Sequence, residues 1–222
     1  AVIESITAVS FSDFLTQRVL APLSIQGVRV DTGSAASNDA TFYELRDNSY
    51  KKAFYVDNTN KIPSGGIMAT PSAMAKLGLQ MITPGIFSAE TRDVLTTPQP
   101  LSNGQPNPQV YALGWRHTQA QLFDGALETP ILHHHGVGYG AVSHFAVYPE
   151  YGMVVSVMMN KNQQAFDLAL HKPIEVLAQN GMMPIGLIIR LGVERKIKQV
   201  LARHPPAQQF RCCRLWHVVV IR

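Results

Sequence analysis

A chain of 222 residues is long enough to bury the core of one domain. Its 46% hydrophobic and 15% charged residues are typical of a soluble globular protein, and no apolar run is long enough to predict a membrane span. The net charge of +4 is unevenly distributed: residues 1–180 carry 11 basic and 14 acidic residues, a balance of −3, whereas residues 181–222 carry eight basic residues and one acidic residue, a balance of +7.

The change in charge near residue 180 coincides with a change in pattern. Residues 1–180 are predicted to form the folded domain, and residues 181–222 a basic tail of atypical composition. Such a tail can favour nucleic acid or anionic lipid, but a solvated segment is the simpler interpretation, and we expect no nucleic-acid partner. Cys212 and Cys213 both lie in this tail, and as direct neighbours they predict neither a disulfide with each other nor a metal site.

The N-terminal third is predicted to hold short elements. Hydrophobic spacing predicts an amphipathic helix over residues 2–20, with Ser10 or Ser12 as the cap of a second helical start. A loop rich in Ser, Gly, Asp and Asn follows. Beyond this loop, which spans residues 24–40, the pattern predicts short strands at 41–46 and 53–56 and a glycine turn at 62–67.

The middle of the chain predicts two helices and then a run of strands. Pro71 opens the first helix, which Thr70 caps and which ends near residue 81, and Ser88 begins the second. After a loop at 98–109, the predicted strands lie at 110–118, 130–135, 140–148 and 153–160, with turns at 136–138 and 149–152. This spacing is typical of an antiparallel meander. With a closing helix at 163–179, bent near Pro173, the fold class is α+β: an antiparallel sheet with packed helices.

Three segments carry a resemblance to a known family. They are the run His-His-His-Gly at 133–136 with the strands that follow it, the segment Ser-Gly-Gly-Ile-Met-Ala-Thr-Pro at 64–71, and Tyr-Ala-Leu-Gly-Trp at 111–115. In order and spacing the chain resembles the serine β-lactamase and penicillin-binding-protein superfamily, on the branch of class C β-lactamases and related esterases. The resemblance covers residues 1–180 and implies an incomplete β-lactamase/transpeptidase-like fold.

The resemblance implies acyl-transfer chemistry on a β-lactam, a D-Ala peptide or a small ester. A serine attacks the carbonyl, a lysine and a tyrosine assist, and a third motif of the type His-x-Gly edges the site. Carried over by position, His134 is the cation or hydrogen-bond donor, Gly136 allows close approach, and the Val137 N–H stabilises the oxyanion. A histidine at that position is expected to titrate near neutral pH and to make substrate anchoring pH-dependent. No cofactor is implied.

The nucleophile motifs of the family are not recognisable in this sequence. There is no Tyr-x-Asn, Tyr-x-Ser or Ser-x-Asn, and the one Ser-x-x-Lys, from Ser49 to Lys52, falls in a polar turn rather than at the start of a buried helix. We therefore expect a C-terminal portion of a hydrolase that is inactive by itself. The alternative is a non-catalytic remnant or ligand-binding module. An open sheet edge and self-association are expected in either case.

A metal site is the remaining alternative for the histidine run. His133 and His135 share one face of a strand and could be joined by His117 or His144, but nearby cysteine ligands are missing, and we expect no metal. Localisation stays open: the resemblance implies a periplasmic or secreted protein, but no signal peptide precedes the domain in this sequence, which starts without Met.

Overall fold

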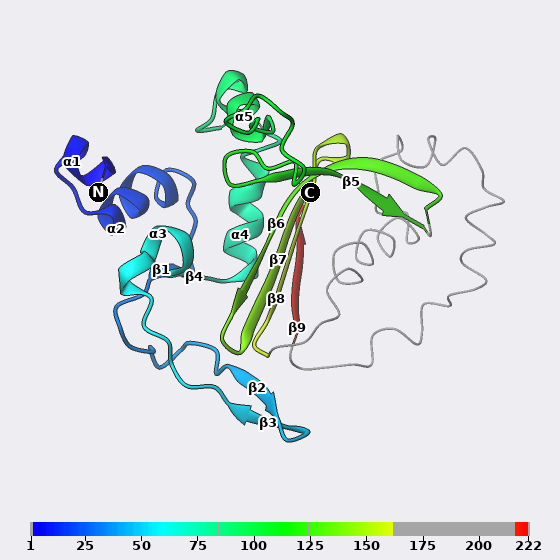
Figure 1. The fold of residues 1–222 in the computed structure, drawn as a ribbon. Helices are drawn as coiled ribbons and strands as arrows, with labels where there is room; N and C mark the ends of the chain where they lie inside the picture. Colours follow the sequence, from blue (N-terminus) through cyan, green and yellow to red (C-terminus); the bar gives the residue numbers. More distant parts are fainter. Residues whose placement is uncertain (1, 84, 124, 162–215, 222) are drawn as a thin grey trace.

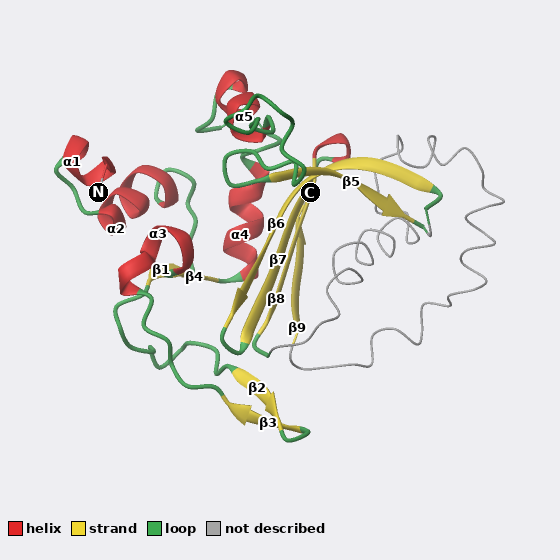
Figure 2. Ribbon diagram, in the orientation of Figure 1, coloured by secondary structure: helices red, strands yellow, loops and turns green. Residues whose placement is uncertain are grey.

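A five-stranded antiparallel sheet forms the centre of the protein. The computed structural model describes residues 2–83, 85–123, 125–161 and 216–221. Within them, the sheet has the strand order β5-β6-β7-β8-β9, and the α-helices lie on one side of it (Figures 1 and 2). The strands are β5 (Arg116–Leu122), β6 (Leu127–Gly138), β7 (Ala141–Tyr148), β8 (Met153–Met159) and β9 (Trp216–Ile221). The predicted antiparallel meander and the α+β class are confirmed.

The hairpin between β6 and β7 corrects one predicted turn. The glycines at 136–138 lie within strand β6, because Gly136 pairs with Ser143 and Gly138 pairs with Ala141. The chain reverses at Tyr139-Gly140 instead, where Gly140 adopts the positive φ of 71° that a tight turn requires. The predicted turn at 149–152 is confirmed as a short 3₁₀-helix over Pro149–Tyr151.

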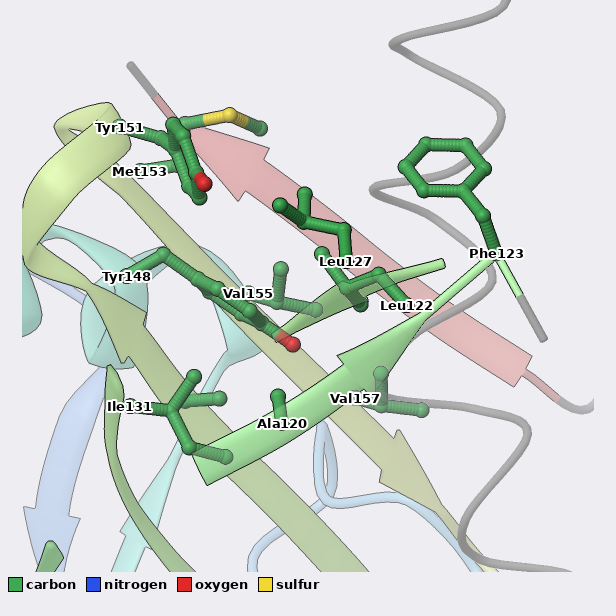
Figure 3. Packing of buried hydrophobic residues seen from close by; sticks show 11 residues of the cluster. Ala120, Leu122, Phe123, Leu127, Ile131, Tyr148, Tyr151, Met153, Val155 and Val157 are labelled. Atoms are coloured by element: carbon green, nitrogen blue, oxygen red, sulfur yellow. The ribbon is translucent and has the colours of Figure 1, made fainter. Parts of the chain in front are cut away.

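Each face of the sheet has its own hydrophobic cluster. On one face, side chains from β5 to β8 pack around the fully buried Tyr148 (Figure 3). On the other face, Leu132, Val147 and Val154 pack against the helix α4 (Pro71–Leu79). As predicted, Thr70 caps α4, its hydroxyl accepting a hydrogen bond from the N–H of Ala73.

The N-terminal helical segment is broken where one helix was predicted. It consists of α1 (Val2–Thr7), α2 (Phe11–Phe14) and the π-helical turn η1 (Leu15–Leu20). The break lies at Ala8, whose φ of 56° is incompatible with a continuing right-handed helix. Ser10 then caps α2 through the N–H of Asp13, as the sequence predicts for one of its two candidates.

Two small two-stranded sheets lie outside the central sheet. Strand β1 (Val28–Val30), in the stretch predicted as loop, pairs with β4 (Ile67–Ala69). Strands β2 (Tyr43–Arg46) and β3 (Ser49–Lys52) form a hairpin whose turn residues, Asp47 and Asn48, both have positive φ. The second strand therefore directly follows the turn, and the predicted strand at 53–56 is wrong.

The remaining described helices are short. They are η2 (Thr59–Lys61), α3 (Ile62–Gly65) and α5 (Ala89–Thr96), the last capped by Ser88 as predicted. None of the helices in the described ranges is long and apolar enough to cross a membrane. The predicted helix at 163–179 lies outside the described residues, but β9, at the end of the tail, pairs with β8.

Candidate functional site

Strand β6 outruns its neighbour β5 and so has an open edge. β5 begins at Arg116, which pairs with His133, whereas β6 continues to Gly138. From His134 onward, β6 pairs only with β7 among the described residues. We call residues 134–138 the open edge, because their backbone groups on the β5 side have no strand partner in this part of the structure.

The alternation of hydrogen bonds along β6 determines which backbone groups point to the open edge. A two-residue hairpin loop closes on a hydrogen-bonded pair, here Gly138 and Ala141. Alternate residues of an antiparallel strand bond to opposite neighbours. The N–H and C=O groups of Val137 and His135 therefore point away from β7, toward the open edge. Val137 is also 74% exposed, so its N–H can be approached from solvent.

His134 stands at the start of the open edge and is tied to Tyr111. Its Nε2 shares a hydrogen bond with the Tyr111 hydroxyl, and the two rings meet edge to face at 5.6 Å between centroids. The Arg116 guanidinium lies over the Tyr111 ring, 5.7 Å from its centroid. His134 pairs with Phe145 and shares its face of the sheet, which is the face that α4 covers.

The surroundings of His134 favour its neutral form. Burial lowers the pKa of His134, and electrostatic repulsion by His135 and Arg116 lowers it further, although a hydrogen bond with the backbone of His135 opposes these effects. Since an ordinary histidine pKa is already near 6.5, the imidazole is neutral at pH 7. The expected titration of His134 near neutral pH therefore stays a prediction, with the pKa displaced downward from its ordinary value by burial.

Ser143 on strand β7 lies close to the Cα of Gly136, on the side where a side chain would project. A Cβ placed at Gly136 would come within 2.8 Å of the Ser143 Oγ. No real side chain fits that spacing unless Ser143 moves. The bare backbone at this point keeps the middle of the open edge accessible, in line with the close-approach role expected of Gly136.

The far end of the open edge has an aromatic border. Tyr139, in the hairpin turn, stacks at 4.2 Å on Phe54, and its hydroxyl accepts a hydrogen bond from Arg46 on strand β2. Both rings remain partly exposed, Phe54 at 59% and Tyr139 at 39%. The segment around the β2–β3 hairpin therefore borders the same strand end that carries Gly136 and Val137.

Ser49 and Lys52 do not form a catalytic pair. Both lie on the exposed strand β3, and Ser49 Oγ donates to the carbonyl of Arg46, three residues back. Residues three apart on a strand point to opposite faces. The structure thus separates the serine from the lysine that would have to activate it.

The other histidines of strands β5, β6 and β7 make local contacts. His133 Nε2 is hydrogen-bonded to the Thr118 hydroxyl, and His117 Nδ1 to the carbonyl of Thr96. The rings of His135 and His144 stack at 5.5 Å. In the part of the chain that the structure describes, no group of three or more His, Cys, Asp or Glu side chains could hold a metal ion.

Tyr111, Arg116 and Ser143 are the neighbours of the site that sequence reasoning did not assign to it. Tyr111 lies within the segment at 111–115 that carries the family resemblance, and that segment was the only available signal. Its contact with His134 joins residues 23 positions apart and depends on where β5 begins.

The family model described as Beta-lactamase matches residues 1–180. No curated protein matches the chain.

Proposed function

Because the chain belongs to the beta-lactamase family of serine hydrolases, we propose that its open edge forms one wall of an acyl-transfer site. The substrate is a β-lactam, a D-Ala peptide or a small ester, and His134, Gly136 and Val137 are the residues of this wall. The observation that carries the proposal is the free stretch of β6 beyond β5, with the Val137 N–H directed to it.

Each residue of the wall has a role that follows from its position. The Val137 N–H is a donor that can stabilise the negative charge of the tetrahedral intermediate. Gly136, where a Cβ would meet the Ser143 hydroxyl, lets an acyl group lie close to the backbone. The neutral imidazole of His134 orders the start of the edge through its bond to Tyr111.

The nucleophile is proposed to come from residues outside this sequence. The single Ser-x-x-Lys is on an exposed hairpin with its two side chains on opposite faces, which argues against Ser49. We therefore propose that the chain is unreactive alone. In a longer protein, on the class C and esterase branch that the sequence resembles, it would supply this wall of the site.

Covalent labelling tests this proposal. The purified chain and a version extended upstream are incubated with a fluorophosphonate or a fluorescent penicillin, and adducts are counted by intact mass. We expect no adduct on the chain of 222 residues and one on the extended form. An adduct mapped to Ser49 would overturn the assignment of the nucleophile. Failure of both forms to label would favour the alternative of a non-catalytic ligand-binding module.

The oxyanion role of Val137 is tested within the extended form. Val137→Pro removes the N–H that faces the open edge and leaves the ladder to β7 intact, because that N–H is not directed to β7. Loss of one oxyanion donor is expected to slow acylation by about 10²–10³-fold. Val137→Ala, which keeps the N–H, is the matched control and should acylate at nearly the original rate. Equal rates for the two variants would refute the role.

A further inference from the structure

We propose that Tyr111 is a positioning residue: its hydroxyl donates a hydrogen bond to Nε2 of His134 and fixes the imidazole as the neutral tautomer that carries its proton on Nδ1. The inference adds a residue to the wall of the site and rests on the proposed function only where catalysis is concerned. The contact between the two side chains is a feature of the fold by itself.

The direction of the hydrogen bond follows from counting donors. A neutral imidazole has one N–H and one acceptor nitrogen. The ring also bonds the backbone of His135, and that bond raises the pKa, which is the direction expected when a ring N–H donates to a carbonyl oxygen. Nε2 faces Tyr111, so the donating nitrogen is Nδ1, and Nε2 must accept the hydroxyl proton of Tyr111.

The local backbone explains why Tyr111 can reach His134. Tyr111 forms an isolated antiparallel bridge with Arg116, the first residue of β5. The N–H of Ala112 bonds the carbonyl of Trp115, and Gly114 has a φ of 83°, so the chain reverses between the two. This reversal places Tyr111 beside the start of β5, where β6 becomes free and His134 begins the open edge.

The charges around His134 support a neutral ring. Arg116 on β5 and His135 on β6 both disfavour a second positive charge at this point. Arg116 has no carboxylate partner among the described residues; its guanidinium donates to Gln109 Oε1 and lies over Tyr111. His133 and His144, from β6 and β7, belong to the opposite face of the sheet, because His133 alternates with His134 and His144 pairs with His135.

The third motif of the site therefore presents a histidine, His134, whose tautomer is fixed by hydrogen bonds. Both ring nitrogens of His134 are used by the protein, one by Tyr111 and one by the strand itself. Tyr111 contributes by holding this state, without contact to the substrate.

The tautomer of His134 can be measured directly by NMR on this chain, and the measurement does not require the chain to be enzymatically active. In ¹⁵N-labelled protein, the shifts of the two ring nitrogens of His134 report which one carries the proton, and a pH titration reports the pKa. We expect the Nδ1–H tautomer. In Tyr111→Phe, which keeps the ring contact and loses only the hydroxyl, we expect a mixture of tautomers and a higher pKa, because an O–H donated to Nε2 stabilises the neutral ring.

The controls separate this inference from the proposed function. Tyr50→Phe removes a hydroxyl on the exposed β3 strand and should leave both observables of His134 unchanged. An Nε2–H tautomer in the original protein, or a pKa that falls or stays the same in Tyr111→Phe, would overturn the inference. In an extended form that acylates, the apparent pKa in the pH profile of kcat/KM should rise in Tyr111→Phe, together with the pKa of His134. Absence of acylation there would count against the proposed function alone.

Discussion

Gly136 on β6 and Ser143 on β7 face each other in neighbouring strands at a distance that admits a side chain at residue 136 only if the Ser143 hydroxyl moves. The modest change Gly136→Ala would bring the new Cβ within 2.8 Å of Ser143 Oγ. Since both residues lie in paired strands, neither backbone can move freely. The steric requirement of the proposed wall can therefore be tested through stability alone.

Gly136→Ala is expected to destabilise the protein by about 1–3 kcal/mol, the usual cost of overpacking. The double variant Gly136→Ala/Ser143→Ala removes the opposing hydroxyl and should recover most of this loss. Chemical denaturation of the two variants and of Ser143→Ala alone completes the cycle. Equal stabilities of the single Gly136 variant and the double variant would show that Ser143 is not the obstacle.

Gly78 in α4 makes the equivalent contact between helix and sheet. A Cβ there would lie 2.7 Å from Phe145 Cζ and 2.7 Å from Val154 Cγ1. Alanine is the better helix former by about 1 kcal/mol, but the clash should dominate, with a net loss of about 1–3 kcal/mol. Gly65→Ala, where the nearest atom is the flexible Lys61 side chain at 3.6 Å, is the control and should be close to neutral in thermal unfolding.

Asp31 should make stability depend on pH in the acid range. Burial opposes its charged form, but hydrogen bonds from Tyr55, Gly33 and Asn58 lower its pKa to about 2. A carboxylate whose pKa is lowered in the folded state stabilises that state fully above its ordinary pKa of 3.8, and the contribution is lost as pH falls toward 2. Urea unfolding between pH 2 and pH 6 should show this loss.

The variant Asp31→Asn removes that pH dependence. It is expected to cost about 1–3 kcal/mol at neutral pH, because hydrogen-bond donors around the buried side chain lose the carboxylate. Its stability should then be flatter between pH 2 and pH 4 than that of the original protein. Asp47→Asn, at a side chain that is 88% exposed, is the control. An unchanged acid profile in Asp31→Asn would assign the effect to other carboxylates.

Removal of residues 216–222 should promote association. β9 pairs along six residues of β8, from Val154 to Met159, so its loss leaves the backbone of a buried apolar strand without a partner on that side. Exposed strand edges of this kind are templates for pairing between chains. Light scattering coupled to size exclusion should show larger species for the shortened chain than for the full one. A shortened chain of the same size would argue that β9 does not protect this edge.

The sequence by itself determined the meander, the caps of α2, α4 and α5, and the family. These features depend on near neighbours: alternation along a strand, a hydroxyl three residues before an N–H, and short motifs in a fixed order. The break at Ala8 and the strand β1 were missed because a positive φ and a pairing with β4 leave little trace in local composition.

Tertiary structure decided which residues form the candidate site and in what state. His134 was found from its motif, but the lowering of its pKa follows from burial and from the approach of Arg116 and His135. Its partner Tyr111 lies 23 residues away and reaches it only because β5 begins at Arg116 while β6 runs on to Gly138. The relative lengths of paired strands are set by packing of the whole sheet, so no local pattern in the sequence could have placed the open edge.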